Sequence, residues 1–208
     1  MRKVILLSTL LMLGACTSVS DTKSVDNTSC VSLHEKGDYD NAIDCFTLLI
    51  EQDKKDYRTY VRRGGSYHRK GDFEKAIADY TNAITLEPNK AATYIVRGMA
   101  YSDNKKYSLA VSDFTQAIKL DPNNANAYFE RGVVWGLWGQ FDDAIEDFSK
   151  SIRFGLNNAE VYGIRGATYF DKGEIDKARN DFNQALKLDP NNEFAIQAIA
   201  RLEERDKK

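Results

Sequence analysis

His34 and His68 are the only histidines of the 208-residue chain, and they are its most obvious candidates for metal or proton chemistry. The interval between them is one that recurs throughout the sequence. A zinc site would need further nitrogen or sulfur ligands at close range. The alternative is two surface histidines without a ligand, and this is the interpretation that we adopt. We therefore expect no metal site.

The motifs of common catalytic sites are missing from the sequence. It contains no glycine-rich phosphate loop, no nucleophile elbow and no HExxH pair. Carboxylates are abundant, but they recur at a fixed interval and so belong to an internal repeat. We expect no enzyme, no cofactor and no small-molecule substrate. With a net charge of −2 and no basic stripe, we expect no nucleic-acid partner either.

The elements that position every side chain come from an internal repeat of about 34 residues, the interval from Tyr60 to Tyr94. Each unit carries an aromatic residue, a glycine, a second aromatic residue, an alanine and a third aromatic residue, and three units end in a proline. The series are Tyr60, Tyr94, Tyr128 and Tyr162; Gly64, Gly98, Gly132 and Gly166; Tyr67, Tyr101, Trp135 and Tyr169; Ala76, Ala110, Ala144 and Ala178; Tyr80, Phe114, Phe148 and Phe182; and Pro88, Pro122 and Pro190.

This series resembles the tetratricopeptide repeat, whose unit is a helical hairpin. The resemblance covers residues 57–192 well, and residues 28–56 and 193–208 more loosely. It implies an all-α fold, a right-handed α-solenoid of one degenerate and four clear repeats with a C-terminal capping helix. A hairpin of this kind cannot bury its apolar face alone, but stacked hairpins can.

The residues of each unit explain the hairpin physically. Small residues at Gly98 and Ala110 let two helices approach closely, and Pro122 cannot continue a helix. We place the units at 28–56 (degenerate), 57–90, 91–124, 125–158 and 159–192, followed by a capping helix at 193–208. In the cap, the apolar residues are expected to face inward: Phe194, Ile196, Ile199 and Leu202.

The N-terminus has the shape of a secretory signal. Two basic residues precede an apolar run that is too short to span a bilayer, and the run ends in Leu-Gly-Ala-Cys16. This end resembles the bacterial lipobox, which implies removal of residues 1–15 and acylation of Cys16. The alternative is an ordinary signal peptide with a coincidental cysteine. Residues 16–27 are polar and are expected to form a flexible tether. Thr17 after the cysteine favours the outer membrane, by resemblance to lipoprotein sorting.

Cys30 and Cys45 remain after lipidation and fall on the two expected helices of the first, degenerate hairpin. Cys30 takes the place that a glycine holds in the other units. In an exported protein such a pair is a candidate disulfide. The alternative is that both are small core residues.

One arginine and one aspartate recur in every clear unit. The arginines directly precede the four glycines, and the aspartates directly precede the third aromatic residues; they are Arg63, Arg97, Arg131 and Arg165, with Asp79, Asp113, Asp147 and Asp181. They predict a ladder of structural ion pairs along the stack. The alternative is independent solvated charges that contribute little.

The concave groove of such a solenoid is the expected binding site, because the family usually binds peptide segments there. In one version of the family, Lys and Asn side chains on the first helices bind the C-terminal carboxylate of a partner. This chain lacks Lys and Asn at those positions. Apolar residues stand on the expected first helices instead, and we predict that they form an exposed peptide-binding floor: Val61, Ile95, Met99, Phe129 and Val133. The alternative is that the solenoid buries them between neighbouring helices.

Trp138 stands where other units have a polar residue in the turn between helices. Either it folds back onto the next hairpin and fills space left by Gly136 and Ser151, or it is an exposed anchor at the rim of the groove.

These observations predict a lipid-anchored scaffold of the bacterial envelope, facing the periplasm, that binds a peptide or helix segment of another envelope protein. An adaptor that regulates a cell-wall enzyme is the alternative, as is an assembly or pilotin-type factor of a secretion or pilus complex.

Overall fold

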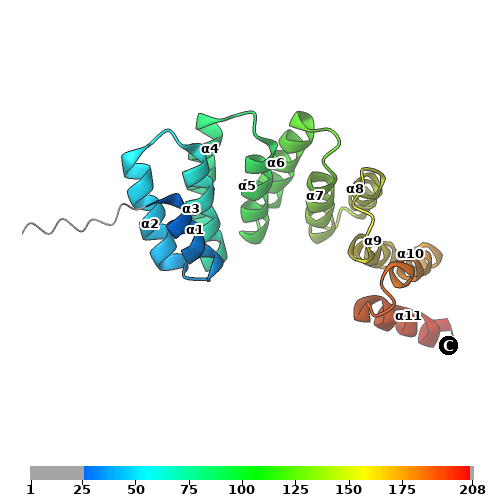
Figure 1. Ribbon diagram of the computed structural model, residues 1–208. Helices are drawn as coiled ribbons and strands as arrows, with labels where there is room; N and C mark the ends of the chain where they lie inside the picture. Colours follow the sequence, from blue (N-terminus) through cyan, green and yellow to red (C-terminus); the bar gives the residue numbers. More distant parts are fainter. Residues whose placement is uncertain (1–25, 207–208) are drawn as a thin grey trace, which may run out of the picture.

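The computed structural model describes residues 26–206, and every regular element in that range is an α-helix (Figure 1). The helices are α1 (Asn27–Glu35), α2 (Tyr39–Gln52), α3 (Tyr57–Lys70), α4 (Phe73–Leu86), α5 (Ala91–Asp103), α6 (Tyr107–Leu120), α7 (Ala125–Leu137), α8 (Phe141–Arg153), α9 (Ala159–Asp171), α10 (Ile175–Leu188) and α11 (Glu193–Asp206). The predictions for residues 1–15, for Cys16 and for most of the 16–27 tether lie outside this range. None of these eleven helices has the length and apolarity needed to cross a membrane.

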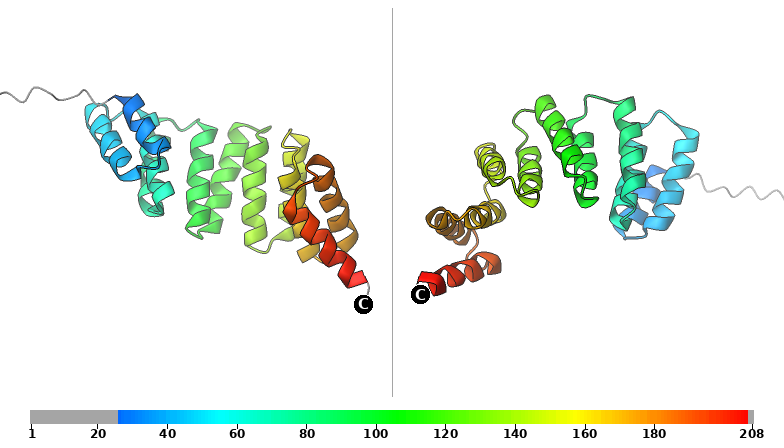
Figure 2. Two further views of the ribbon diagram at one scale, coloured as in Figure 1. Left: turned by 60° about the horizontal axis from the view of Figure 1, so that its bottom comes forward. Right: turned by 180° about the vertical axis from the view of Figure 1, so that it is seen from behind.

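Consecutive helices pair into hairpins, from α1 with α2 to α9 with α10, and each hairpin packs on the next. Figure 2 shows the hairpins following one another in a single curved row, with the two ends far apart. The predicted all-α solenoid is therefore confirmed. The first helices of most neighbouring hairpins also contact one another. For example, α1 contacts α3, and α5 contacts α7. They form the inner layer of the curve, and the second helices form the outer layer.

The close approach of the two helices in a hairpin depends on the recurring glycine. At Gly98 on α5, a β-carbon would lie 2.9 Å from a ring carbon of Phe114 on α6. Phe114 is fully buried, so its ring cannot move aside. The same relationship joins Gly132 to Phe148, again at 2.9 Å. The repeated glycine and the third aromatic residue are therefore one packing unit.

The turns inside the hairpins use a left-handed residue to end the first helix. Gly71 has φ +85° and follows α3 in the polar turn Arg-Lys-Gly71-Asp, because glycine adopts this conformation at no steric cost. The turn after α5 is different, because Lys105 adopts φ +58° there without being glycine. Such a residue carries a small conformational strain.

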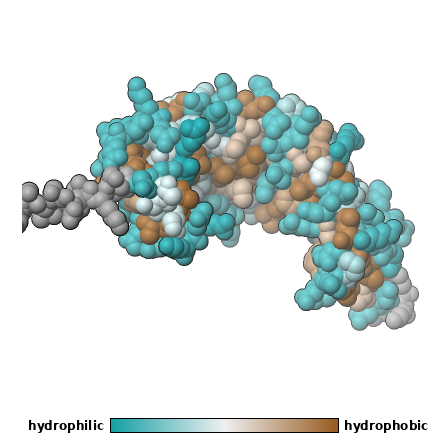
Figure 3. Space-filling model, viewed as in Figure 1, coloured by the Kyte–Doolittle hydropathy of each residue, from teal (hydrophilic) through white to brown (hydrophobic). Residues whose placement is uncertain are grey.

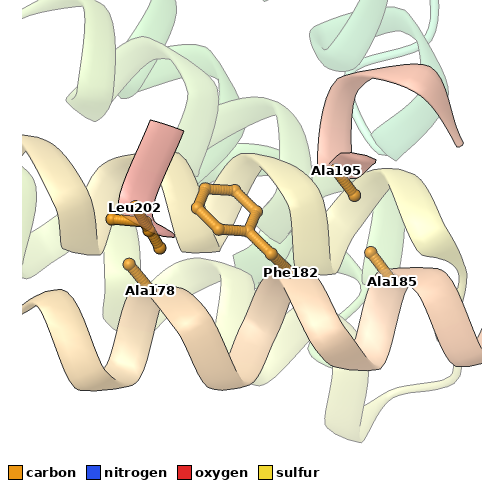
Figure 4. Close-up of a cluster of buried hydrophobic side chains, with 5 residues drawn as sticks. All are labelled: Ala178, Phe182, Ala185, Ala195 and Leu202. Atoms are coloured by element: carbon orange, nitrogen blue, oxygen red, sulfur yellow. The ribbon is translucent and has the colours of Figure 1, made fainter. Parts of the chain in front are cut away.

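The C-terminal helix covers the last hairpin only in part. Figure 4 shows the Phe182 side chain between the pair Ala178 and Leu202 and the pair Ala185 and Ala195, so α10 and α11 share one core cluster. Leu202 is buried and Ile199 is half-buried, as predicted.

Two residues of the cap are more exposed than predicted. Phe194 is 54% exposed, although its ring packs against the buried Phe182 ring with centroids 6.0 Å apart. Ile196 is 47% exposed, so the prediction that it faces the core is wrong. Ile196 stands one full repeat after Tyr162, and no second helix follows α11 in the described residues to cover it. The physical reason is therefore a missing neighbour.

Candidate functional site

The candidate site is the concave groove lined by the first helix of each hairpin. Apolar surface gathers around α5 and α7 in the middle of the curve, between polar edges (Figure 3). The groove deepens into pockets at both ends. A pocket of about 260 Å³ lies over α1, α3 and α5, and another of about 210 Å³ lies between α9 and α11. The fold thus presents a long apolar depression with two deeper ends.

The five predicted floor residues lie on α3, α5 and α7, but each is half-buried and none is exposed. Val61 packs against the cluster around Tyr80, Met99 against the cluster around Phe114, and Phe129 against the cluster around Phe148. The rings of Phe129 and Phe148 are 5.9 Å apart. The prediction of an exposed patch is corrected accordingly: the same side chains contribute to the core and leave only one side toward the groove.

Several exposed large apolar side chains stand at the ends of inner helices: Leu137, Trp138 and Phe170, together with Phe194 at the start of α11. Others lie on second helices, among them Leu48, Leu109 and Leu188. Leu137 takes the same place on α7 as Asp103 on α5 and Asp171 on α9, and both aspartates line groove pockets. Leu137 and Phe170 were not predicted as groove residues from the sequence. The signal was present, since both are apolar where neighbouring units are polar or small.

Trp138 matches neither interpretation completely. It is 45% exposed and is not among the side chains packed against the core cluster around Phe182 of the next hairpin. Instead its ring stacks on Trp135 of the same unit, with centroids 5.7 Å apart and the planes nearly parallel. The two indoles form an aromatic platform at the end of α7.

The recurring arginines and aspartates form bidentate pairs in all four clear units. Arg97 donates from Nε and Nη2 to the two carboxylate oxygens of Asp113, at 2.7 and 2.8 Å. This bond raises the pKa of the Arg97 guanidinium above its usual value. The other pairs have the same geometry: Arg63 with Asp79, Arg131 with Asp147, and Arg165 with Asp181. All four aspartates are buried, so the pairs are structural and lie outside the groove floor.

A third group completes each pair. The Nη1 atom of Arg97 donates to the Thr81 hydroxyl of the preceding unit at 3.0 Å. The equivalent acceptors are Thr47, Thr115 and Ser149. Each arginine therefore joins its own hairpin to the previous one. These hydroxyls were not predicted from the sequence, although they recur with the same period as the arginines, one position after the third aromatic residue.

Cys30 on α1 and Cys45 on α2 are joined by a disulfide, with their Cα atoms 5.4 Å apart. Cys30 is fully buried and takes the close-approach position. The short α1 is thereby held covalently against α2. It carries one wall of the N-terminal groove pocket, through Val31 and His34.

The two histidines lie on neighbouring first helices and have separate partners. His34 Nδ1 lies 2.9 Å from the Ser66 hydroxyl, and His68 Nε2 lies 2.7 Å from an Asp103 carboxylate oxygen. Within residues 26–206, no three His, Cys, Asp or Glu side chains are grouped so that they could hold a metal ion. Both histidines border the N-terminal pockets.

Glu130 on α7 is an unusual carboxylate on the wall of the groove. It is half-buried and forms no hydrogen bond or ion pair with the described residues. Burial raises the pKa of its carboxyl group, and the charges of Asp103 on α5 and Glu160 on α9 raise it further. The middle of the groove therefore combines apolar surface with negative charge.

Comparison with protein-family models gives matches over most of the chain. One model described as tetratricopeptide repeat matches residues 57–90, 91–124 and 159–192. Two further models with the same description match residues 114–146 and 31–56. A search of curated proteins found no match.

Solved structures with the same fold extend the comparison. A crystal structure of MamA is 27% identical, covers 77% of this chain and 94% of its own, and has a TM-score of 0.72. MamA from Desulfovibrio magneticus RS-1 is 18% identical, with 80% and 94% covered and a TM-score of 0.73. YrrB, described as a TPR protein with an unusual peptide-binding site, is 20% identical, with 83% and 89% covered and a TM-score of 0.69.

Proposed function

The chain belongs to the tetratricopeptide repeat family, and from this premise we propose that it is a lipid-anchored scaffold of the bacterial cell envelope that binds a segment of another envelope protein in its groove. A protein-binding scaffold fits the family matches and the fold of the solved relatives. The lipid anchor, the location in the envelope and the identity of the partner as an envelope protein are our proposal and go beyond these matches.

The observation that carries the proposal is the groove itself. Its floor is apolar along α3, α5 and α7, and exposed Leu137, Trp138 and Phe170 stand beside it. Apolar side chains gathered in a concave surface are typical of sites that receive an amphipathic helix or an extended segment. YrrB, which has the same fold, is described as having a peptide-binding site, and this supports a similar use of the groove here.

The location in the envelope is supported by two independent features. The sequence before Cys16 has the order of a lipoprotein signal, with basic residues, an apolar run and small residues. The bond between Cys30 and Cys45 is typical of proteins that fold in an oxidising compartment. Stable anchoring needs more than one acyl chain, which an acylated N-terminal cysteine provides. The tether would keep the groove close to the membrane surface.

The groove is tested by site-specific photocrosslinking in intact cells that produce the full chain. A photoreactive residue replaces Leu137, which is 60% exposed on α7, or Leu109, which is 46% exposed on α6. Both sites are exposed leucines, but only the first lies on the inner layer. We expect one polypeptide to be crosslinked from position 137 and none from 109. Equal crosslinking from both positions, or none from 137, contradicts a groove partner.

The anchor is tested separately with Cys16→Ser. We expect the variant to lose incorporation of labelled palmitate and to leave the membrane fraction. A variant that stays in the membrane and still incorporates the label contradicts lipidation at this residue.

A further inference from the structure

The floor of the groove has a depression at Gly65 on α3. The first helices that follow have a side chain at the equivalent place: Met99 on α5, Val133 on α7 and Ala167 on α9. Without such a side chain, the pocket of about 260 Å³ opens between α1, α3 and α5. Val31, Val61 and Val96 supply apolar walls. The depression is thus large enough to receive a side chain from a bound segment.

Tyr80 supplies a hydrogen-bond donor to this depression. The other four units have phenylalanine at this place, namely Phe46, Phe114, Phe148 and Phe182. Tyr80 is only 2% exposed, and its hydroxyl forms no hydrogen bond with residues 26–206 but is open to the pocket that it lines. A β-carbon on Gly65 would lie 3.9 Å from that hydroxyl oxygen. Burial raises the pKa of Tyr80, so the hydroxyl keeps its proton. A donor in such a confined place is unfavourable unless a ligand or solvent satisfies it.

His34 supplies an acceptor beside the same point. Its Cε1 atom would lie 3.8 Å from a β-carbon on Gly65. The Ser66 hydroxyl lies 3.2 Å from the carbonyl oxygen of Arg62, which it can approach only as a donor, and 2.9 Å from His34 Nδ1. When the hydroxyl donates to Arg62, the proton in the second contact is on His34 Nδ1. Burial, and then the charge of Arg69, lower the pKa of His34, so the ring is neutral near pH 7. Nε2 then carries a lone pair, and it has no partner among the described residues.

We propose that this pocket is a subsite for a carboxamide side chain, Asn or Gln, of the partner segment in the groove. A carboxamide offers both an oxygen acceptor for the Tyr80 hydroxyl and an NH₂ donor for His34 Nε2. A carboxylate has no proton to donate to His34. An ammonium group has no acceptor for Tyr80, and it would also meet Arg62 and Arg69. The subsite deepens the proposed function and rests on it.

Two substitutions test the subsite without disturbing the fold. Tyr80→Phe removes one oxygen and restores the residue that the other four units have. Gly65→Leu fills the depression, at a place where Met99 and Val133 show that the hairpin accepts a large side chain. The matched control is Met99→Leu, which keeps the volume of the floor one unit further along. Circular dichroism melts would establish that all three variants remain folded.

The probe is a phage-displayed library of random twelve-residue peptides, selected on the full chain in detergent micelles. We expect the selected peptides to share one Asn or Gln among apolar residues. Their Kd should rise about threefold to tenfold on Tyr80→Phe, the effect of one lost uncharged hydrogen bond. Replacing the shared Asn or Gln by Leu should cause a larger loss on the native chain, where it removes both hydrogen bonds, than on Tyr80→Phe, where only the bond to His34 remains to be lost. Met99→Leu should change the Kd by less than the Tyr80 substitution.

The possible failures point to different conclusions. Selected peptides without a shared carboxamide, or with equal affinity for the native chain and Tyr80→Phe, overturn the subsite and leave the groove intact as a binding site. The subsite is also overturned if the selected peptides bind Gly65→Leu as tightly as they bind the native chain. If no peptide is enriched and position 137 yields no crosslinked polypeptide, the proposed function itself is wrong, and the subsite falls with it.

Discussion

Arg97 and Asp113 are locked together by two parallel hydrogen bonds, and the same arginine reaches back to Thr81 of the previous hairpin. The Asp113 side chain is only 7% exposed and that of Arg97 is 16% exposed. The pair therefore connects one unit to the next in a largely dry environment, where removing one partner leaves the other charge unsatisfied.

Asp113→Ala is expected to destabilise the solenoid by about 3 kcal/mol, because it strands a half-buried guanidinium. The matched control is Asp142→Ala, whose carboxylate is 82% exposed and pairs with Lys172 at the surface. That change should cost at most about 1 kcal/mol. Urea unfolding followed by circular dichroism measures both. Equal midpoints for the two variants would mean that the repeated pairs contribute no more than surface charges do.

Two glycines on inner helices are predicted to respond in opposite directions. Gly98→Ala places a methyl group 2.9 Å from the buried Phe114 ring and should destabilise by about 1–3 kcal/mol. Gly65→Ala meets nothing closer than 3.8 Å and should stabilise by about 0.5–1 kcal/mol, since alanine favours the helix. Thermal melts of both variants decide this. A loss of stability in Gly65→Ala contradicts the open depression over α3.

These contrasts also show how far the sequence alone could lead. The fixed period from Gly64 to Gly98 was enough to predict the hairpins, because glycine and its facing aromatic residue must recur together in a stacked fold. The pairing of Arg97 with Asp113 followed from the same register. The exposure of Ile196 could not be predicted from it, since exposure at that position depends on whether a further helix covers the side chain.

The groove was harder to predict for a related reason. Val61 and Phe129 stand at positions that face the concavity, but the curvature of the stack decides how much of each side chain its neighbours cover. The depression at Gly65 depends on Tyr80 and His34, which lie on two other helices. A periodic sequence hides such a site, because it arises where single units depart from the repeat.

Glu130→Gln is expected to stabilise the protein near neutral pH. Burial in the folded state disfavours the charged form of Glu130 and so raises the pKa of its carboxyl group above the unfolded value. This penalty is fully present above the folded pKa and disappears as the pH falls below the unfolded value of 4.5. At pH 7.5 the melting temperature of Glu130→Gln should exceed that of the native chain by about 1–3 °C, and at pH 4 the two should agree.

Glu51→Gln, on the exposed side of α2, is the control and should have little effect at either pH. A gain for Glu130→Gln that is the same at pH 4 and pH 7.5 would show that it does not come from the desolvated carboxylate.

Reduction of the Cys30–Cys45 bond is expected to loosen the first hairpin alone. A disulfide that closes a loop of this length contributes about 3 kcal/mol to the free energy of unfolding. It acts on α1, which is the shortest helix of the described chain. Amide hydrogen exchange with and without dithiothreitol should show lost protection in α1 and α2, and unchanged protection in α7 to α10. The double variant Cys30→Ala, Cys45→Ala should show the same hydrogen exchange as the reduced chain, and dithiothreitol should not change it. Unchanged protection of α1 after complete reduction contradicts this role.

Trp138 could contribute both to the stability of the fold and to binding of the partner, and substitutions can separate these two roles. Stacking on Trp135 should stabilise by about 0.5–1.5 kcal/mol, so Trp138→Ala should lower the melting temperature by about 2–4 °C. Trp138→Phe keeps a ring on Trp135 and should recover most of this loss. If the exposed edge of Trp138 contacts the partner, photocrosslinking from position 137 should fall in both variants, because phenylalanine does not reach as far. Full crosslinking in Trp138→Ala would limit this tryptophan to stabilising the end of α7.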